Sequence, residues 1–383
     1  MPFLAVVSVA CFAGAVSIRV VDPIVPEMAR DWAVSPALIA LIASAFAFPY
    51  ALSQPILGPV ADAVGKARVI KIGLAVLTVA TLATALSPTL ELVFATRIIA
   101  GVAGGAIIPV ALAMVGDRVP LHERQIALSH LLSAMLVAQL VSLIGSGWIA
   151  SLFGWRWAMG AVAIISLIAW TGALIGLAPR RVARDSLSFD SLKDSYRDVF
   201  ANPKAKFCYA AVFAEGMLIF GILPFIATML EARGAGGIAE AGLVIAGMGI
   251  GGLAFTLTLK HTLARLGGMF NVIRLGAVAV GVGFAGVAMQ GSWPFEMVAF
   301  SALGFGFYAV HNALQTQATE LSSEHRGAAV ALHAFFFFLG HAAGPPIYSL
   351  SFPLLGESGT VLIAGISLCL GALFLAHALE TRS

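Results

Sequence analysis

The feature that most constrains this chain is a succession of long apolar runs, each separated from the next by a few polar or charged residues. The runs extend over about 4–29, 36–61, 69–87, 90–116, 125–150, 157–178, 205–230, 238–259, 270–290, 294–319, 326–350 and 358–379. A helix needs about 20 predominantly apolar residues to cross a bilayer, and these runs use nearly all of the 383 residues. The sequence therefore predicts an all-α membrane protein of twelve transmembrane helices, without a separate soluble domain.

The composition excludes an ordinary soluble protein. Hydrophobic residues make up 60% of the chain and charged residues 11%, whereas soluble domains carry about 25% charged residues. No run of basic residues with interleaved aromatics indicates nucleic-acid binding. The three cysteines and the histidines lack metal-ligand spacing, so we expect no cofactor and no metal.

One longer polar stretch divides the apolar runs into six and six. It predicts two six-helix bundles, 1–178 and 205–383, joined by a cytoplasmic linker over 179–204. Within the stretch, residues 188–200 form either a short amphipathic helix on the membrane surface or part of a solvated linker.

Two pairs of residues indicate that the halves are pseudo-symmetric copies of one unit. Gly65 and Gly267 each follow the second run of their half, and Arg124 and Arg326 each open the fifth. Both pairs are 202 residues apart. Repeats of this kind are common in transporters, whose solute sites lie near the midplane at the repeat interface.

The distribution of lysine and arginine predicts the orientation. With the N-terminus in the cytoplasm, 17 basic residues fall on the cytoplasmic side and three on the outer side. Cytoplasmic loops carry the excess of positive charge. We therefore expect a bacterial-type inner (plasma) membrane protein with both termini in the cytoplasm.

The loop after the second run resembles a signature of the major facilitator superfamily: a glycine, an aspartate four residues on, a glycine three further, then basic residues. The matching residues here are Gly58, Asp62, Gly65, Lys66 and Arg68. The resemblance implies a loop that works as a conformational latch between the halves. The second-half copy departs from the pattern, because Ala264 stands in the place of the aspartate.

Three further motifs resemble the superfamily's twelve-helix drug:proton antiporter branch. They are Arg97 with Gly101 and Gly105 in the fourth run, Gly-Trp-Arg-Trp at 154–157, and Asp22-Pro-Ile-Val-Pro26 in the first run. The fifth run lacks the Gly-Pro ending of antiporters. A Gly340-x-x-x-Gly344-Pro345 pattern stands in the eleventh run instead, and we expect these glycines to pack helices closely.

Charged residues at bilayer depth are costly and usually serve function. Asp22 and Arg97 lie at matching depth, about 10 Å inside the outer end at about 1.5 Å per residue. The resemblance implies that Asp22 is a protonation site near the solute. The alternative is a permanent Asp22–Arg97 salt bridge that fixes two helices. Glu215 is the second candidate for proton coupling, with local pairing as its alternative.

Several polar residues are candidates for solute binding. Arg19 shares a helix face with Asp22 and either neutralises it or leaves a positive site for an anionic solute. In the tenth run His311 and Gln315 share a face, and with Asn312 they either line a cavity or bond between helices. Gln54, Gln139 and His341 are weaker candidates. Histidines 130, 333 and 341 are each predicted to pack rather than to relay protons.

We expect a secondary active transporter that works by alternating access and is coupled to protons. The resemblance to the antiporter branch implies that it exports a small organic solute, and the resemblance to the superfamily implies a monomer. The sequence contains no Walker A motif, so ATP hydrolysis is not the expected drive. The first alternative is uptake or facilitated diffusion of a small organic anion on Arg19 and Arg97. A membrane-embedded enzyme or receptor is the second, but HExxH and GxSxG motifs and an output domain are absent.

Overall fold

A computed structural model describes residues 2–178 and 189–381. The chain divides into two compact units, residues 1–188 and 189–383. The described residues form helices and connecting turns, with no β-strand. Residues 179–188 of the predicted linker lie outside the described residues.

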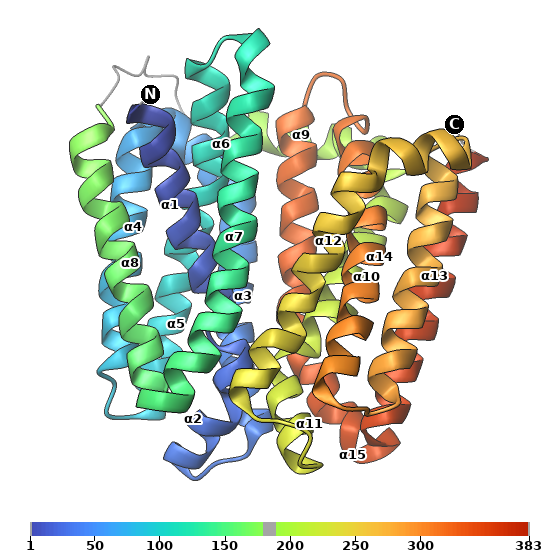
Figure 1. The fold of residues 1–383 in the computed structure, drawn as a ribbon. Helices are drawn as coiled ribbons and strands as arrows, with labels where there is room; N and C mark the ends of the chain where they lie inside the picture. The colour runs from blue at the N-terminus through green and yellow to red at the C-terminus, as the bar shows by residue number, and fades with distance from the viewer. Residues whose placement is uncertain (1, 179–188, 382–383) are drawn as a thin grey trace. The chain divides into compact units, whose positions relative to one another are not determined.

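The described residues of unit 1 form eight α-helices and one short 3-10 turn (Figure 1). In chain order they are α1 (Pro2–Arg19), η1 (Asp22–Ile24), α2 (Val25–Trp32), α3 (Pro36–Val64), α4 (Lys66–Ala85), α5 (Leu90–Gly105), α6 (Ile107–Arg118), α7 (Leu121–Phe153) and α8 (Trp155–Gly176). The chain passes through the unit six times, because α1, η1 and α2 form one span and α5 and α6 form another.

Unit 2 repeats this plan after one additional helix at its start. Its elements are α9 (Phe189–Ala201), α10 (Ala205–Gly221), η2 (Leu223–Phe225), α11 (Ile226–Ala232), α12 (Ile238–Leu266), α13 (Met269–Ala288), α14 (Trp293–Thr319) and α15 (Arg326–Glu380). The helix α9 covers the stretch for which an amphipathic helix on the membrane surface and a solvated linker were alternatives. Its helical form is confirmed, and its place on the membrane surface stays a prediction.

Eleven helical segments in the described part of the chain are long and apolar enough to cross a membrane. The last, α15, has 55 residues, which at 1.5 Å per residue is more than twice a bilayer core of about 30 Å. Its backbone leaves the helical region at Gly356, where φ is +70° and ψ is 166°. Glycine adopts this conformation without a steric penalty. The break separates the two predicted spans 326–350 and 358–379, which brings the total to twelve.

Prolines break three spans that the sequence analysis treated as continuous. Pro23 and Pro224 lie in η1 and η2, the turns that interrupt the first span of each unit. Pro109 follows the junction of α5 and α6. Proline lacks an N–H, so the carbonyl four residues earlier loses its helical donor. Each break therefore exposes backbone carbonyls that need another partner.

The two units share equivalent helix packing. Gly101 of α5 lies against the backbone of Phe46 in α3, and Gly304 of α14 lies in the same way against Met248 in α12. The helices α3 and α12 each have 29 residues, and α4 and α13 each have 20. A Cβ at either glycine would overlap the facing backbone, so small residues set the distance between the helices.

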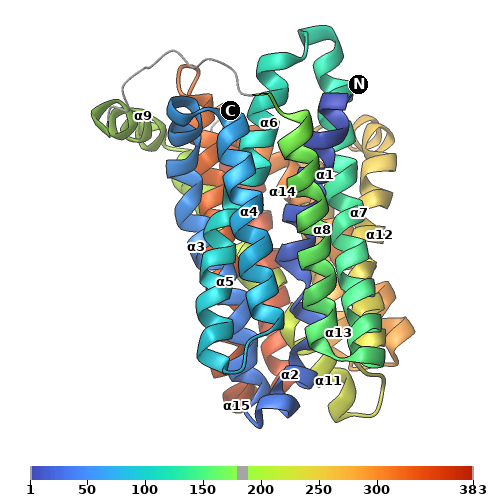
Figure 2. The same ribbon diagram turned by 90° about the vertical axis from the view of Figure 1, so that its left-hand side faces the viewer.

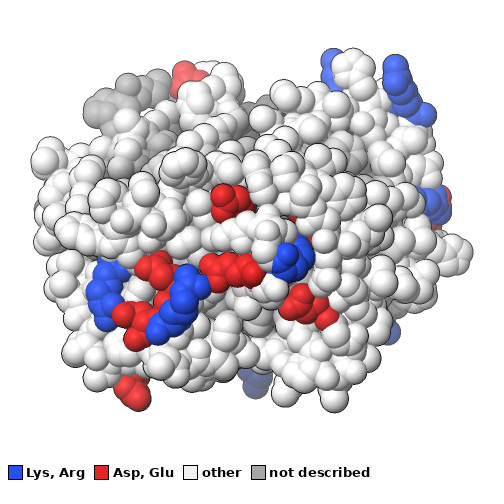
Figure 3. Space-filling model, turned by 60° about the horizontal axis from the view of Figure 1, so that its bottom comes forward, with Lys and Arg blue, Asp and Glu red and all other residues white. Residues whose placement is uncertain are grey.

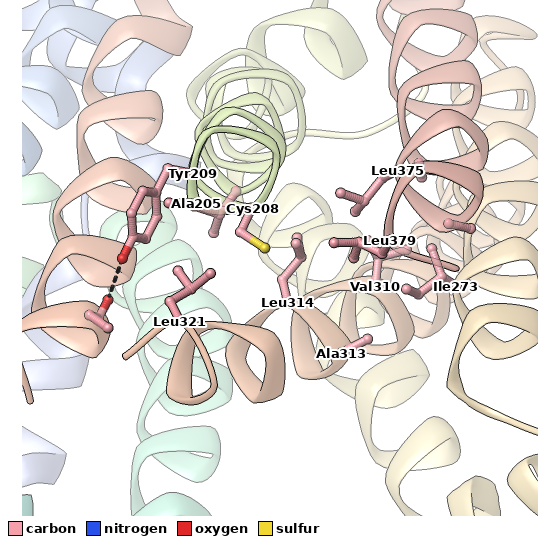
Figure 4. Packing of buried hydrophobic residues seen from close by; sticks show 14 of the residues in the cluster. Ala205, Cys208, Tyr209, Ile273, Val310, Ala313, Leu314, Leu321, Leu375 and Leu379 are labelled. Carbon is pink, nitrogen blue, oxygen red and sulfur yellow. Dashed lines mark hydrogen bonds between the residues drawn. The ribbon is translucent and has the colours of Figure 1, made fainter. Parts of the chain in front are cut away.

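A second close helix pair in unit 2 is formed by α10 and α15. A Cβ on Gly340 would meet the backbone of Phe213, and one on Gly344 would meet Gly221. Towards the end of the unit that carries α9, these helices enclose an apolar cluster with α13 and α14 (Figure 4). Tyr209 of α10 donates a hydrogen bond of 3.1 Å from Oη to the carbonyl of Ala329 beside this cluster.

The helix α9 is fastened to unit 2. Asn202, just after α9, donates a hydrogen bond of 3.0 Å to the carbonyl of Leu321, and Ser322 donates one of 2.7 Å to Asp198. The ring of Phe200 lies edge-on to that of Tyr209. These contacts place the start of α10, the end of α14 and the start of α15 at the same end of the unit.

Candidate solute and proton site

The break in the first span holds the buried acid of unit 1. Arg19 is the last residue of α1, and Asp22 opens the 3-10 turn that contains Pro23. Their side chains are 5% and 1% exposed, and Arg19 Nη1 lies 3.6 Å from Asp22 Oδ2. Asp22 therefore pairs with the arginine of its own span.

Arg97 of α5 approaches the same break from another helix. Its guanidinium is fully buried and lies 4.3 Å from the centre of the Phe46 ring. Nη2 donates a hydrogen bond of 3.1 Å to the carbonyl of Ser17 in the last turn of α1. Among the described residues, Nε and Nη1 have no hydrogen-bond partner, and Asp22 lies beyond 4.0 Å. The expected Asp22–Arg97 geometry is thus a shared neighbourhood rather than a direct ion pair.

The last turn of α1 is held by side chains from neighbouring helices. Besides Arg97, Ser142 of α7 donates a hydrogen bond of 2.7 Å to the carbonyl of Val16. A helix end leaves carbonyls without intrahelical donors and carries partial negative charge. The Arg97 guanidinium and the Ser142 hydroxyl both supply hydrogen-bond donors, and the guanidinium also offsets the negative charge. The sequence analysis missed Ser142, although its spacing from Gln139 and Ser146 places all three near one face of α7.

Charges of both signs are buried around the break. Two buried guanidiniums surround one buried carboxylate in unit 1. Charges in an apolar interior interact far more strongly than in water. A proton added to or removed from Asp22, or an anion bound beside Arg97, would change this balance directly.

Unit 2 has a different buried acid at mid-depth. Glu215 of α10 is 2% exposed, and its Oε2 lies 2.9 Å from Nδ1 of His311 on α14. Glu215 Oε1 has no hydrogen-bond partner among the described residues. Two residues that were predicted for different roles, proton coupling and solute binding, are therefore direct partners.

Aromatic rings surround the Glu215–His311 pair. The centre of the His311 ring lies 4.9 Å from that of Phe307 and 5.0 Å from that of Phe337. His341 is buried beside Phe220, with ring centres 5.3 Å apart. The aromatic run 335–338 thus packs into unit 2, and its rings make the surroundings of the acid apolar.

The remaining solute candidates lie apart from these two acids. Gln54 of α3 donates a hydrogen bond of 3.3 Å to the carbonyl of Gly105, the group that Pro109 leaves without a helical donor. Gln139 is half-buried on α7, whereas Asn312 and Gln315 are exposed on α14. Gln54 therefore has a structural partner already, and the exposed pair does not line a closed pocket within unit 2.

The predicted latch residues lie in the last turns of α3, at the junction Gly65 and in the first turn of α4. Gly65 has φ +103°, a conformation that favours glycine. Lys66 lies 2.9 Å from Asp62 and 2.6 Å from Asp117 at the end of α6. Arg68 is exposed, and a Cβ on Gly58 would meet no neighbour. The turn is thus fastened inside unit 1 by a lysine between two aspartates.

A polar cluster that the sequence analysis did not identify lies at the opposite end of unit 1. Glu27 accepts a hydrogen bond of 2.9 Å from the backbone N–H of Trp155, the first residue of α8. Asp31 forms an ion pair with Arg156 and accepts a hydrogen bond of 2.9 Å from Trp155 Nε1. Side chains of both charges gather at this end (Figure 3), where α2 lies below the longer helices (Figure 2). The cluster fastens α2 to the N-terminus of α8, which favours acidic partners.

Comparison with known sequences gives one family over most of the chain. The profile of the Major Facilitator Superfamily matches residues 7–345. The uncharacterized MFS-type transporter YwfA of Bacillus subtilis is 24% identical over 341 residues, which cover 86% of this chain and 81% of that protein. The quinolone resistance protein NorA of Staphylococcus aureus (strain MRSA252) is 22% identical over 357 residues, which cover 92% and 90%.

Solved structures give the same fold. The nucleoside transporter NupG superposes with a TM-score of 0.77 at 17% identity, over 99% of both chains. A D-xylose–proton symporter superposes with a TM-score of 0.76 at 16% identity, over 98% of this chain and 96% of the other. At such low identity the likeness shows the fold and says nothing of the solute.

Proposed function

The chain belongs to the major facilitator superfamily of membrane transporters, and from that premise we propose that it exports a small organic solute in exchange for protons. It is a multi-pass protein of the bacterial plasma membrane, and its family consists of transporters rather than enzymes. Export is favoured by the full-length similarity to NorA, a protein named for quinolone resistance. Alternating access would open the site to each side of the membrane in turn.

The observation that carries the proposal is the carboxyl group of Asp22 at the break of the first span. It is buried beside two guanidiniums, and neither of its oxygens has a hydrogen-bond partner among the described residues. An acid at bilayer depth is a functional-site hypothesis by default. Because Asp22 follows a helix break, small changes of the backbone there would alter its exposure to solvent.

Reconstitution in liposomes tests this proposal. Proton flux would be measured for wild type, Asp22→Asn and Glu215→Gln while ethidium, tetraphenylphosphonium, salicylate or fumarate is supplied in turn. Glu91→Gln is the matched control, because Glu91 is an exposed acid at the start of α5. We expect one solute to drive proton movement, and Asp22→Asn to abolish that movement while solute binding persists. Unchanged coupled transport in Asp22→Asn would refute the assignment.

A second candidate function is uptake or facilitated diffusion of a small organic anion. The two nitrogens of the buried Arg97 guanidinium that have no hydrogen-bond partner among the described residues favour it. Arginine is well suited to hold a carboxylate or phosphate. In the same assay this function predicts transport of salicylate or fumarate that persists without a proton gradient and fails in Arg97→Gln.

Orientation and the latch complete the proposal. Both termini face the cytoplasm, so the turn 58–68 lies on the cytoplasmic side and works as a conformational latch. Single cysteines placed at Ser35 and at Arg68 would report the orientation. Both residues are exposed in loops or helix starts, and a membrane-impermeant thiol reagent on intact cells should label the first and not the second.

A further inference from the structure

The buried cluster of unit 2 includes a residue to which the proposed function gives no role. His333 of α15 is 3% exposed, and the centre of its ring lies 4.9 Å from that of His311. Its Nε2 has no hydrogen-bond partner among the described residues. A buried polar atom without a partner destabilises a fold. Four phenylalanines follow at 335–338. Because apolar rings pack on this helix next to His333, packing alone does not explain an imidazole at this position.

The titratable groups of the surrounding helices are few. Apart from charged residues in their first turns, α10 contributes Glu215, Tyr209 and Cys208, α14 contributes His311 and Tyr308, and the first half of α15 contributes His333, His341 and Tyr348. Tyr209 is engaged with the carbonyl of Ala329, one turn before His333 (Figure 4). His341 lies among the rings of Phe220 and Phe338. The helix α13, which packs against α14 and α15, has Arg274, and this residue forms an ion pair with Glu380.

The charge of the cluster depends on protons alone. Within the described residues, no lysine or arginine forms an ion pair with Glu215. A carboxylate with two neutral imidazoles carries a charge of −1, and one added proton makes the cluster neutral. A second proton would leave a net positive charge in an apolar site, which is unfavourable. The cluster is therefore suited to hold one transferable proton.

Glu215 and His333 lie at different depths, measured from one end of the unit. Glu215 is about ten residues from the start of α10, and His333 about seven from the start of α15. At about 1.5 Å per residue these depths are about 15 Å and 10 Å. Both helices begin at the end that carries α9. His333 thus stands between the acid and that end.

We propose that His333 is a proton-relay residue that passes a single proton between that end of unit 2 and the Glu215–His311 pair. The inference rests on the proposed proton-coupled function. His333 gains a proton at Nε2 and gives one from its other ring nitrogen towards His311, directly or through one water. His311 gains that proton and gives the one on Nδ1 to Glu215 Oε2. One proton enters, each ring exchanges one N–H bond for another, and a carboxyl group forms at Glu215.

A pH jump followed by time-resolved infrared spectroscopy tests the relay without any solute. The purified full-length protein would be shifted from alkaline to acidic pH while the carboxyl C=O band is recorded. We expect a band that is absent in Glu215→Gln. In His333→Gln the band should reach its normal height but form at least about tenfold more slowly, because a positioned proton donor has been removed. His377→Gln is the matched control, since His377 is an exposed histidine on the same helix.

A second variant separates a relay from a packing role. In His333→Ala the band should form slowly, and free imidazole added to the same sample should restore the rate. The proposal is overturned if His333→Gln forms the band as fast as wild type, if the band survives in Glu215→Gln, or if imidazole leaves His333→Ala slow. Failure of the export proposal would show differently, as no solute moving protons in liposomes while the infrared kinetics remain as expected.

Discussion

The close contact between α3 and α5 makes a quantitative prediction about stability. In Gly101→Ala the new Cβ would lie 2.8 Å from Pro49 Cγ and closer still to the carbonyl of Phe46. Carbon atoms are in favourable contact at about 3.5–4.0 Å. The facing atom is backbone and cannot rotate away, so the helices must separate. Overpacking of this kind costs about 1–3 kcal/mol.

The control is Gly160→Ala in α8. A Cβ on Gly160 would meet no atom within 4 Å, and both glycines lie inside helices. Replacing a helical glycine by alanine is favourable by about 1 kcal/mol. This gain is common to both variants, so the difference between their stabilities measures the cost of the clash at Gly101.

The measurement is the thermal unfolding midpoint, Tm, of the purified protein in detergent. One kcal/mol corresponds to about 2–4 °C for a unit of this size. We expect Gly101→Ala to unfold about 2–12 °C below Gly160→Ala. If the two variants unfold at the same temperature, glycine does not set the spacing of these helices, and the packing argument fails.

Three further predictions concern single contacts, each measured by Tm in the same detergent. Gln54→Leu leaves the carbonyl of Gly105 without a donor, so stability should fall by about 1–3 kcal/mol; no change would mean that another donor takes its place. Gly356→Ala places a side chain at φ +70° and should cost about 1–2 kcal/mol, whereas an unchanged Tm would argue against the break. Lys66→Met removes two partly exposed ion pairs and should cost less than about 1 kcal/mol at each; a much larger loss would show that the Asp62–Lys66–Asp117 arrangement is more than a surface interaction.

The first spans of the two units, each broken by a 3-10 turn, show how a common plan can support different chemistry. In unit 1, Ser142 and Arg97 hold carbonyls of the last turn of α1. In unit 2, Tyr348 of α15 donates a hydrogen bond of 2.7 Å to the carbonyl of Leu218 near the end of α10. The acid that follows Arg19 in the first break has no counterpart in the second, where Leu223 opens η2. Glu215 lies earlier, inside α10, so each unit places its acid in a different setting.

The twelve spans and the superfamily could be predicted from the sequence because they depend on local properties. A run of about 20 apolar residues is stable across a bilayer whatever its neighbours are. The turn after α3 was identified by residues that are close together along the chain, from Gly58 to Arg68. Even the break at Gly356 was anticipated as a loop, because the apolar runs end and begin on either side of it.

The partners of the buried charges were decided by the tertiary structure. Sequence spacing placed Asp22 and Arg97 at the same depth. In the structure Asp22 lies beside Arg19 of its own span, and Arg97 donates to the carbonyl of Ser17. Glu215 and His311 are 96 residues apart along the chain, and no local pattern joins them. Depth follows from counting residues along a helix. The face that a side chain presents to another helix depends on breaks, rotations and glycine contacts that only the packed bundle determines.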